Sequence, residues 1–264
     1  MSVIAVIPAR YASSRLPGKP LLRQTGKYLI QHVWERACAA GAGVDRVVVA
    51  TDDSRIADAV KSFGGEAVLT RADHPSGTDR VAETARLLGL SPHDFVLNLQ
   101  GDEPEIDPAV LIRLAEAVRN PSADRAEGVH TLAAGFSDAG PSSGPGSPAD
   151  PNCVKVVVDH RSRALYFSRS LIPYPRATRG EVDRPGRWLL HLGVYAYRVD
   201  VLLRLADRDT MPPSVLEEAE SLEQLRWLEN GRAIFVLIVN PQMPGIDTPE
   251  DYAAFVRRAT GSDG

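Results

Sequence analysis

The N-terminal stretch that decides the fold reads Val3-Ile4-Ala5-Val6-Ile7-Pro8-Ala9-Arg10-Tyr11-Ala12-Ser13-Ser14-Arg15-Leu16-Pro17-Gly18-Lys19-Pro20. Its β-branched run predicts a buried strand, and Pro8 is expected to end it because proline cannot donate to a sheet ladder. Arg10, Arg15 and Lys19 then follow the strand's carboxyl end, where open α/β sheets bind ligands. Since Arg forks and a Lys charge suit a polyphosphate, we predict a phosphate-binding loop rather than a merely solvated basic loop.

Two familiar phosphate motifs are missing from this sequence. A P-loop needs Gly-x-x-x-x-Gly-Lys-Ser/Thr, but Pro20 follows Gly18-Lys19 and Ser13 occupies the first glycine position. No Gly-x-Gly-x-x-Gly pattern follows the first strand, so a dinucleotide-binding fold is not indicated.

Composition narrows the class of protein. The chain has 264 residues, a net charge of -4 and 44% hydrophobic residues, which suits one large globular α/β domain. The acidic balance predicts no nucleic-acid partner, so the basic loop is expected to bind a small molecule. Cys38 and Cys153 form no metal-binding pattern and are expected to be buried free thiols. No signal peptide or membrane span is predicted, and the cytoplasm follows by default.

The first half alternates strand and helix patterns. Strands are predicted at 3–7, 47–51, 67–69 and 95–99, and helices at 28–40, 54–64, 78–88 and 108–119. Ser54 is the expected cap of the second helix. This alternation implies right-handed βαβ units, hence a parallel sheet with helices on both faces.

The second half changes character. Strand patterns at 129–136, 153–158, 164–167 and 189–198 have no helices between them, which predicts antiparallel additions to the sheet. Helices are predicted at 199–206 and 216–229, a strand at 234–239, and a final helix capped at Thr248. The segment 137–152 is rich in Pro, Gly and Ser, and we expect a mobile surface loop there. With no repeat and no clear boundary, we predict one domain over residues 1–264.

Two aspartates are candidate metal ligands. Asp102 directly follows a buried strand, and Asp247 precedes the cap of the last helix. Mg²⁺ typically binds one or two carboxylates plus substrate phosphates. Taken alone, Asp102 could equally belong to an ordinary turn, and Asp247 could simply interact with the positive end of the helix. Ser76, in a similar position before a helix, is either a cap or a contact to a base or phosphate.

Several stretches together resemble the 3-deoxy-manno-octulosonate cytidylyltransferase (CMP-Kdo synthetase) family. The opening stretch from Ile7 to Pro20 is the most specific, and the resemblance extends from Val3 to Tyr252. The other similar stretches are Arg71–Arg80, Gln100–Pro104, Phe167–Pro173, His191–Tyr195, Glu223–Arg226 and Gly245–Asp251. The segment Ser137–Asp150, the residue Tyr28 and the run Met243-Pro244-Gly245 depart from the family pattern.

The resemblance implies a fold and an activity. The fold is a Rossmann-like nucleotidyltransferase fold of the α/β class, with a mainly parallel sheet and an antiparallel extension for dimerisation and sugar binding. The activity is transfer of CMP from CTP to 3-deoxy-D-manno-octulosonate (Kdo), giving CMP-Kdo and pyrophosphate for lipopolysaccharide biosynthesis. It implies a Mg²⁺ cofactor, a homodimer, a CTP-binding half at 1–128 and a sugar-binding half at 129–264.

The resemblance also implies roles for individual residues. The metal ligands are Asp102 and Asp247. The residues acting on the phosphates and the reacting centre are Arg10, Arg15, Lys19 and Asp102. The substrate contacts are Ser76, Gln100, Arg169, His191, Tyr195, Glu223 and Gln224.

Two alternatives stay open at this level. A synthetase for another acid sugar, such as sialic acid or 8-amino Kdo, would share the basic loop and the metal ligands. A non-catalytic nucleotide-binding protein could also use the same fold, since fold alone does not fix function.

Overall fold

The computed structural model describes residues 1–12, 16–120, 125, 128–243 and 245–261. Arg15, one of the predicted phosphate contacts, lies outside these residues. The chain divides into two compact units: unit 1 contains Met1–Arg119 and Gln242–Gly264, and unit 2 contains Asn120–Pro241. The C-terminal segment with Asp247 therefore belongs to the same unit as the N-terminal loop.

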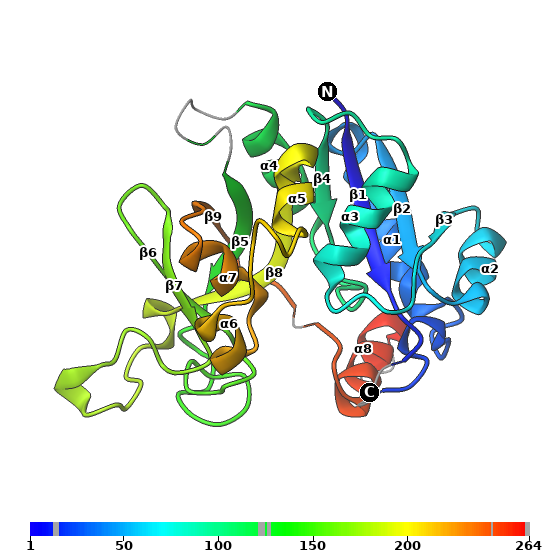
Figure 1. Cartoon of the computed structure of the whole chain (residues 1–264). Helices are drawn as coiled ribbons and strands as arrows, with labels where there is room; N and C mark the ends of the chain where they lie inside the picture. The colour runs from blue at the N-terminus through cyan, green and yellow to red at the C-terminus, as the bar shows by residue number, and fades with distance from the viewer. Residues whose placement is uncertain (13–15, 121–124, 126–127, 244, 262–264) are drawn as a thin grey trace. The chain divides into compact units, whose positions relative to one another are not determined.

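Unit 1 contains a parallel sheet in the order β3-β2-β1-β4 (Figure 1). Its strands are β1 (Val3–Ala9), β2 (Arg46–Thr51), β3 (Glu66–Leu69) and β4 (Phe95–Asn98), and its helices are α1 (Leu29–Cys38), α2 (Ser54–Ser62), α3 (Gly77–Leu87), α4 (Pro108–Arg119) and α8 (Pro249–Thr260). The chain passes from β1 to β2 on one side and returns to β4 on the other side of β1. That reversal creates a crevice at the carboxyl ends of β1 and β4, where α/β folds bind ligands.

Two sequence expectations for unit 1 were wrong in detail. β1 does not end at Pro8 but continues to Ala9. The ladder with β4 ends at Val6, so Pro8 lies where its missing N–H interrupts no pairing with that strand. The cap of α2 is Asp53, whose side chain accepts from the Arg55 backbone N–H, and not Ser54.

Unit 2 is built on mixed pairing. β5 (Val129–Gly135) runs parallel to β9 (Ile234–Val239) and antiparallel to β8 (Leu189–Arg198). β6 (Lys155–Val158) pairs antiparallel with β7 (Ala164–Ser168) and β8. The helices are α5 (Val199–Leu205), α6 (Val215–Glu220) and α7 (Glu223–Glu229). The predicted antiparallel additions are confirmed.

One expectation for unit 2 was wrong, and the structure adds contacts to the segment that a second expectation concerned. The single helix predicted over 216–229 is two helices, because Ser221 takes a positive φ of 50° and ends α6. The 137–152 segment is not loose throughout: Ser147 and Asp150 are buried, and the Asp150 carboxylate accepts from the backbone N–H groups of Gly146 and Asn152, both at 2.8 Å. Hydrogen bonds to one carboxylate order a segment that buries little apolar surface.

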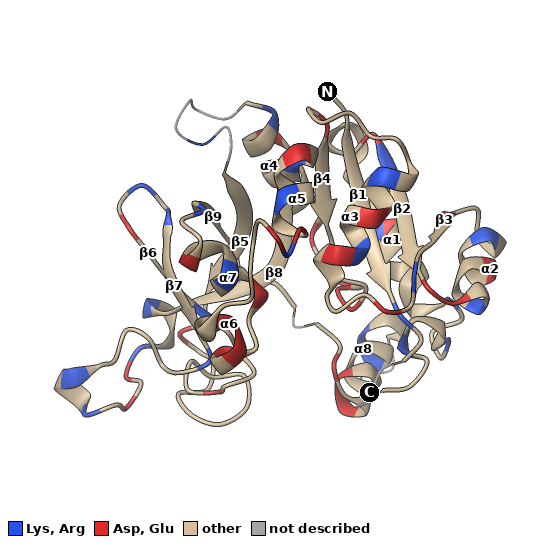
Figure 2. Cartoon of the chain, viewed as in Figure 1, with Lys and Arg blue, Asp and Glu red and all other residues tan. Residues whose placement is uncertain are grey.

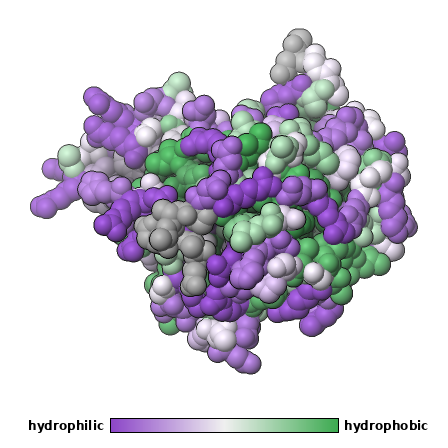
Figure 3. Space-filling model, turned by 90° about the horizontal axis from the view of Figure 1, so that it is seen from above, coloured by the Kyte–Doolittle hydropathy of each residue, from purple (hydrophilic) through white to green (hydrophobic). Residues whose placement is uncertain are grey.

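Both cysteines are free, but their expected burial was wrong, because Cys38 is exposed and Cys153 is only half-buried. Within the described residues, no helix combines the length and the apolar character needed to cross a bilayer. Hydrophilic residues cover most of the face shown in Figure 3, where hydrophobic residues gather in smaller areas.

Candidate functional site

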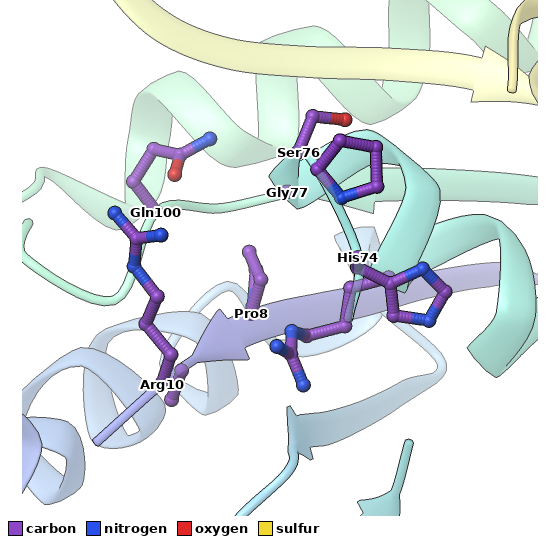
Figure 4. Close-up of a pocket in the computed structure, with 9 residues that line it drawn as sticks. Pro8, Arg10, His74, Ser76, Gly77 and Gln100 are labelled. Atoms are coloured by element: carbon purple, nitrogen blue, oxygen red, sulfur yellow. The ribbon is translucent and has the colours of Figure 1, made fainter. Parts of the chain in front are cut away.

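A cavity of about 200 Å³ opens at the carboxyl ends of the unit 1 strands (Figure 4). Three of the predicted residues line it: Arg10 follows β1, Gln100 follows β4, and Ser76 precedes α3. In Figure 4 the guanidinium of Arg10 extends toward Gln100. The other lining residues are Pro8, Ala9, His74, Pro75, Gly77 and Arg80.

Local structure explains why these side chains meet. Ser76 caps α3, because its hydroxyl accepts from the Asp79 backbone N–H at 3.2 Å. The helix therefore begins at the cavity, and a helix N-terminus favours anionic ligands. Gly101 allows the loop after β4 to approach β1, since a Cβ there would lie 2.9 Å from the Pro8 carbonyl oxygen. The cavity thus depends on a cap and a glycine, not only on the ends of strands.

Arg80 is a lining residue that the sequence did not single out. Its side chain is buried, with Nη1 donating to Thr70 Oγ1 at 2.6 Å and Nη2 to Asp52 Oδ2 at 3.2 Å. Arg80 is four residues after Ser76, a spacing that places both on one face of α3. That spacing was the available signal, and it was missed because the capping residues explained the stretch by themselves.

A second cluster in unit 1 gathers the two candidate metal ligands around Lys19. Lys19 Nζ lies 2.9 Å from Asp102 Oδ2 and 3.6 Å from Asp247 Oδ1, and it donates to the Ile246 carbonyl at 2.7 Å. The two carboxylates therefore converge on one positive charge although they are far apart in the sequence. Burial and the carboxylates of Asp102 and Asp247 raise the pKa of the neighbouring Glu103 to about 8, against the effect of Lys19.

The loop that holds Asp247 is fixed from both sides. On one side, the Ile246 N–H donates to the Asp102 carbonyl at 2.8 Å, which joins the two carboxylate loops directly. On the other side, Asp251 in α8 accepts from the backbone N–H groups of Asp247 and Thr248. The predicted Thr248 cap is confirmed as a full capping box. Asp247 is thus positioned by backbone hydrogen bonds, while its carboxylate faces Lys19.

Lys19 owes its place to the closure of the N-terminal loop. Gly18 has a positive φ of 66°, and its N–H donates to the Tyr11 carbonyl at 3.2 Å. The Arg55 guanidinium lies 3.5 Å from the centre of the Tyr11 ring, a cation–π contact. Tyr11 is therefore held between Arg55 and the turn that precedes Lys19.

These carboxylates fit a magnesium ion only in part. Among the described residues, no group of three or more His, Cys, Asp or Glu side chains could hold a metal. Asp102 and Asp247 supply two carboxylates, and the shared cation Nζ of Lys19 shows that both can contact one positive charge. Mg²⁺ suits this number of protein ligands where substrate phosphates complete its coordination.

Unit 2 brings together His191 and Tyr195, whose rings lie 5.3 Å apart on β8. Burial lowers the pKa of His191 to about 3, so its imidazole is neutral, and Nε2 lies 3.1 Å from Thr131 Oγ1. Burial also raises the pKa of Tyr195 well above its usual value. Within the described part of the chain, the buried Tyr195 hydroxyl has no hydrogen-bond partner. A buried hydroxyl without a hydrogen-bond partner lowers the stability of the folded protein, and a bound ligand can supply the missing hydrogen bond.

The remaining candidates in unit 2 lie around α6 and α7. Glu223 Oε1 accepts from Arg226 Nη2 at 3.0 Å, and Gln224 is buried on the same helix. Arg169 follows β7 and contacts Glu220 of α6. Within the acidic run Glu217–Glu220, Glu220 accepts from the Ser168 hydroxyl and from the Arg169 backbone N–H.

Comparisons with known proteins extend over both units. A family model described as Cytidylyltransferase matches residues 4–234. The 3-deoxy-manno-octulosonate cytidylyltransferase of Syntrophobacter fumaroxidans is 50% identical over 256 residues, 97% of this chain and 96% of that protein. The Escherichia coli protein of the same name is 49% identical, covering 93% of this chain and 91% of its own length. A solved structure of CMP:2-keto-3-deoxy-manno-octonic acid synthetase complexed with CTP superposes with a TM-score of 0.84 at 46% identity, over 99% of this chain and 100% of that one.

Proposed function

Because the chain belongs to the 3-deoxy-manno-octulosonate cytidylyltransferase family, we propose that Asp102 and Asp247 hold a magnesium ion beside the phosphates of CTP. The reaction transfers CMP from CTP to Kdo and releases pyrophosphate. The observation that carries the proposed roles is the convergence of two loop carboxylates and Lys19 within 4 Å.

The reaction is an in-line displacement. The acceptor hydroxyl attacks the α-phosphorus, the bond to the bridging oxygen of pyrophosphate breaks, and the hydroxyl proton passes to water. A magnesium ion held by Asp102 and Asp247 would neutralise phosphate charge and would lower the pKa of the attacking hydroxyl. This chain's residues supply the rest: Lys19 stabilises charge on the departing phosphates, while Arg10 and Gln100 orient nucleotide and sugar in the cavity.

The acid sugar contacts a different set of side chains in this proposal. Arg169 pairs with its carboxylate through a charge-assisted hydrogen bond from the guanidinium. The neutral imidazole of His191 and the unpaired hydroxyl of Tyr195 contact sugar hydroxyls, together with Glu223 and Gln224. Ser76 contacts the nucleotide at the start of α3.

Substrate choice provides the direct test. We would measure pyrophosphate release with CTP, UTP, ATP and GTP, each against Kdo, 8-amino Kdo and sialic acid, with and without Mg²⁺. CTP with Kdo and Mg²⁺ should give the largest kcat/KM, and removal of Mg²⁺ by chelation should abolish turnover. A higher kcat/KM with another acid sugar would replace Kdo as the acceptor. Full turnover without divalent cations would remove the metal from the mechanism.

We also propose that the protein is a homodimer. Unit 2 exposes large apolar side chains, with Leu165 58%, Tyr174 63% and Ile238 48% accessible. Sedimentation equilibrium should give about twice the 28.6 kDa mass of the chain. A monomer at micromolar concentration would contradict this part of the proposal.

A further inference from the structure

The guanidinium of Arg169 is held by two backbone carbonyls of unit 2. Its Nε donates to the Glu220 carbonyl at 2.7 Å, and its Nη1 donates to the Pro151 carbonyl at 3.1 Å. Glu220 ends α6, and Pro151 belongs to the segment before β6. Within the described residues, Nη2 of Arg169 has no protein acceptor. The side chain is therefore fixed through Nε and Nη1, while Nη2 stays available.

The backbone of Arg169 is held as well. Its N–H donates to Glu220 Oε2 at 2.8 Å, and the other carboxylate oxygen, Oε1, accepts from Ser168 Oγ at 2.5 Å. On the opposite side, the Arg169 carbonyl accepts from Lys155 Nζ at 2.6 Å. Glu220 and Lys155 thus hold the same peptide from its two ends.

Lys155 is an unusual residue for this position. It lies in β6 with no exposed surface, and its Nζ also donates to the Asp150 carbonyl at 2.9 Å. Burial lowers the pKa of Lys155, which reflects the cost of removing an ammonium from water. An apolar side chain would fill a buried strand position without that cost. Both hydrogen bonds of Lys155 end on the backbone that frames Arg169.

Glu220 is unusual because it belongs to an acidic surface helix and yet makes contacts with another part of unit 2. Figure 2 shows α6 as an acidic helix, and its neighbour Glu218 is exposed. Glu220 instead reaches across 51 or 52 positions of the sequence to β7. One acidic side chain of α6 thus has a role that its exposed neighbour lacks.

We infer that Glu220 and Lys155 are positioning residues, which hold Arg169 so that the free edge of its guanidinium receives the carboxylate of the acid sugar. The inference rests on the proposed function, in which Arg169 contacts that carboxylate. A guanidinium that is already held in place loses little conformational entropy when the sugar binds. The expected gain is therefore in sugar affinity rather than in turnover.

Steady-state kinetics of Glu220→Gln, Lys155→Met and the control Glu218→Gln test this inference. Glu220→Gln and Lys155→Met should each raise the KM for Kdo by about tenfold or more, and leave kcat and the KM for CTP within about twofold. Glu218→Gln should match the wild type. An unchanged Kdo KM in Glu220→Gln, or an equal rise in both KM values, would overturn the inference. If Lys155→Met does not fold, Glu220→Gln still decides the result.

A double-mutant cycle separates positioning from a purely structural role. In an Arg169→Lys background, Glu220→Gln should change the Kdo KM by less than about threefold, because the side chain that it positions is already gone. A full tenfold effect in that background would show that Glu220 acts independently of Arg169. The wild-type enzyme separates failure of the proposed function from failure of this inference. If the wild type forms no product from CTP and Kdo, the proposed function is refuted. If the wild type is active and the variants have the same kinetics, only the positioning role is refuted.

Discussion

The carboxylate cluster of unit 1 and the Arg169 region of unit 2 use charge in opposite ways. In unit 1, the side chains of Asp102 and Asp247 keep 29% and 49% of their surface accessible. In unit 2, Lys155 is fully buried, and His191 and Tyr195 are kept neutral by burial. The first region keeps its carboxylates partly in water, while the second has already removed its polar groups from water.

The difference follows from the ligands proposed for each region. The triphosphate of CTP binds together with cations, and two of its phosphates leave as pyrophosphate. The side chains that contact it therefore need access to solvent and freedom to move. An acid sugar has one carboxylate and several hydroxyls, which are distinguished by geometry. Side chains that are already desolvated and held in place by the fold provide that geometry in advance. Unit 1 is therefore expected to control the rate, and unit 2 the affinity for the acceptor.

The largest expected effect is on the rate. Asp102→Asn or Asp247→Asn should lower kcat by about 10²–10³, because each removes part of the charge that stabilises the transition state. Sugar affinity, measured by titration with an unreactive CTP analogue present, should stay within about threefold. Glu250→Gln, an exposed acidic residue of α8, is the matched control. Near-normal kcat in either Asp variant at saturating Mg²⁺ would discard the metal assignment.

The next effect is on sugar affinity. Arg169→Ala should weaken Kdo binding by about 2–3 kcal/mol, since it removes a charge-assisted contact to a carboxylate. CTP binding in the absence of sugar should stay unchanged. Calorimetric titrations of both ligands would measure this. An equal loss of affinity for CTP and for the sugar would contradict the assignment of CTP binding to unit 1 and of sugar binding to unit 2.

A smaller effect is expected on stability at Asp150. Asp150→Ala removes the acceptor of the Gly146 and Asn152 backbone N–H groups, so the free energy of unfolding should fall by about 1 kcal/mol. Urea denaturation would measure it, with the exposed Ser142→Ala as control. If Asp150→Ala melts like the wild type, the segment is as loose as its composition suggests.

The last effect is absent at neutral pH and develops only as the pH falls. His191 has a pKa of about 3 in the folded protein against an ordinary value of 6.5, so the unfolded chain binds more protons between these values. Its contribution to stability is therefore complete above pH 6.5 and is lost as the pH falls toward 3. His191→Gln should flatten the acid limb of the stability curve by up to about 1.4 kcal/mol per pH unit. Parallel curves for wild type and variant between pH 4 and 6.5 would show that His191 is not held neutral.

Local sequence patterns predicted most helices and strands and the residues that line the cavity of unit 1 at the ends of its strands. Arg10 and Gln100 could be placed because each follows a buried strand of a parallel sheet, and parallel strands end at one edge. Thr248 and Ser76 could be identified as caps because capping depends on residues within one turn. Asp53 replaced Ser54 because both are good caps and only the backbone conformation decides between them.

Long-range partners could not be predicted in this way. Nothing near Glu220 in the sequence indicates that it accepts from Arg169, and nothing in the strand pattern of β6 indicates that Lys155 is buried. These contacts depend on which elements become neighbours in unit 2. The positive φ of Ser221 likewise has no local signal, because serine is not a residue that commonly adopts it.

The return of the C-terminal segment to unit 1 also affects how the protein is made. Ile246, Tyr252 and Phe255 pack with Leu29 in one buried cluster, and Asp247 lies in the same segment. During translation the ribosome finishes the first four strands of unit 1 long before this segment emerges. The nascent chain therefore lacks Asp247, one of the two carboxylates proposed to hold the metal, and the apolar cover of α1 until synthesis is nearly complete. We therefore expect a polypeptide truncated before residue 245 to be less stable and to lack activity, because it has lost both the packing on Leu29 and the Asp247 carboxylate.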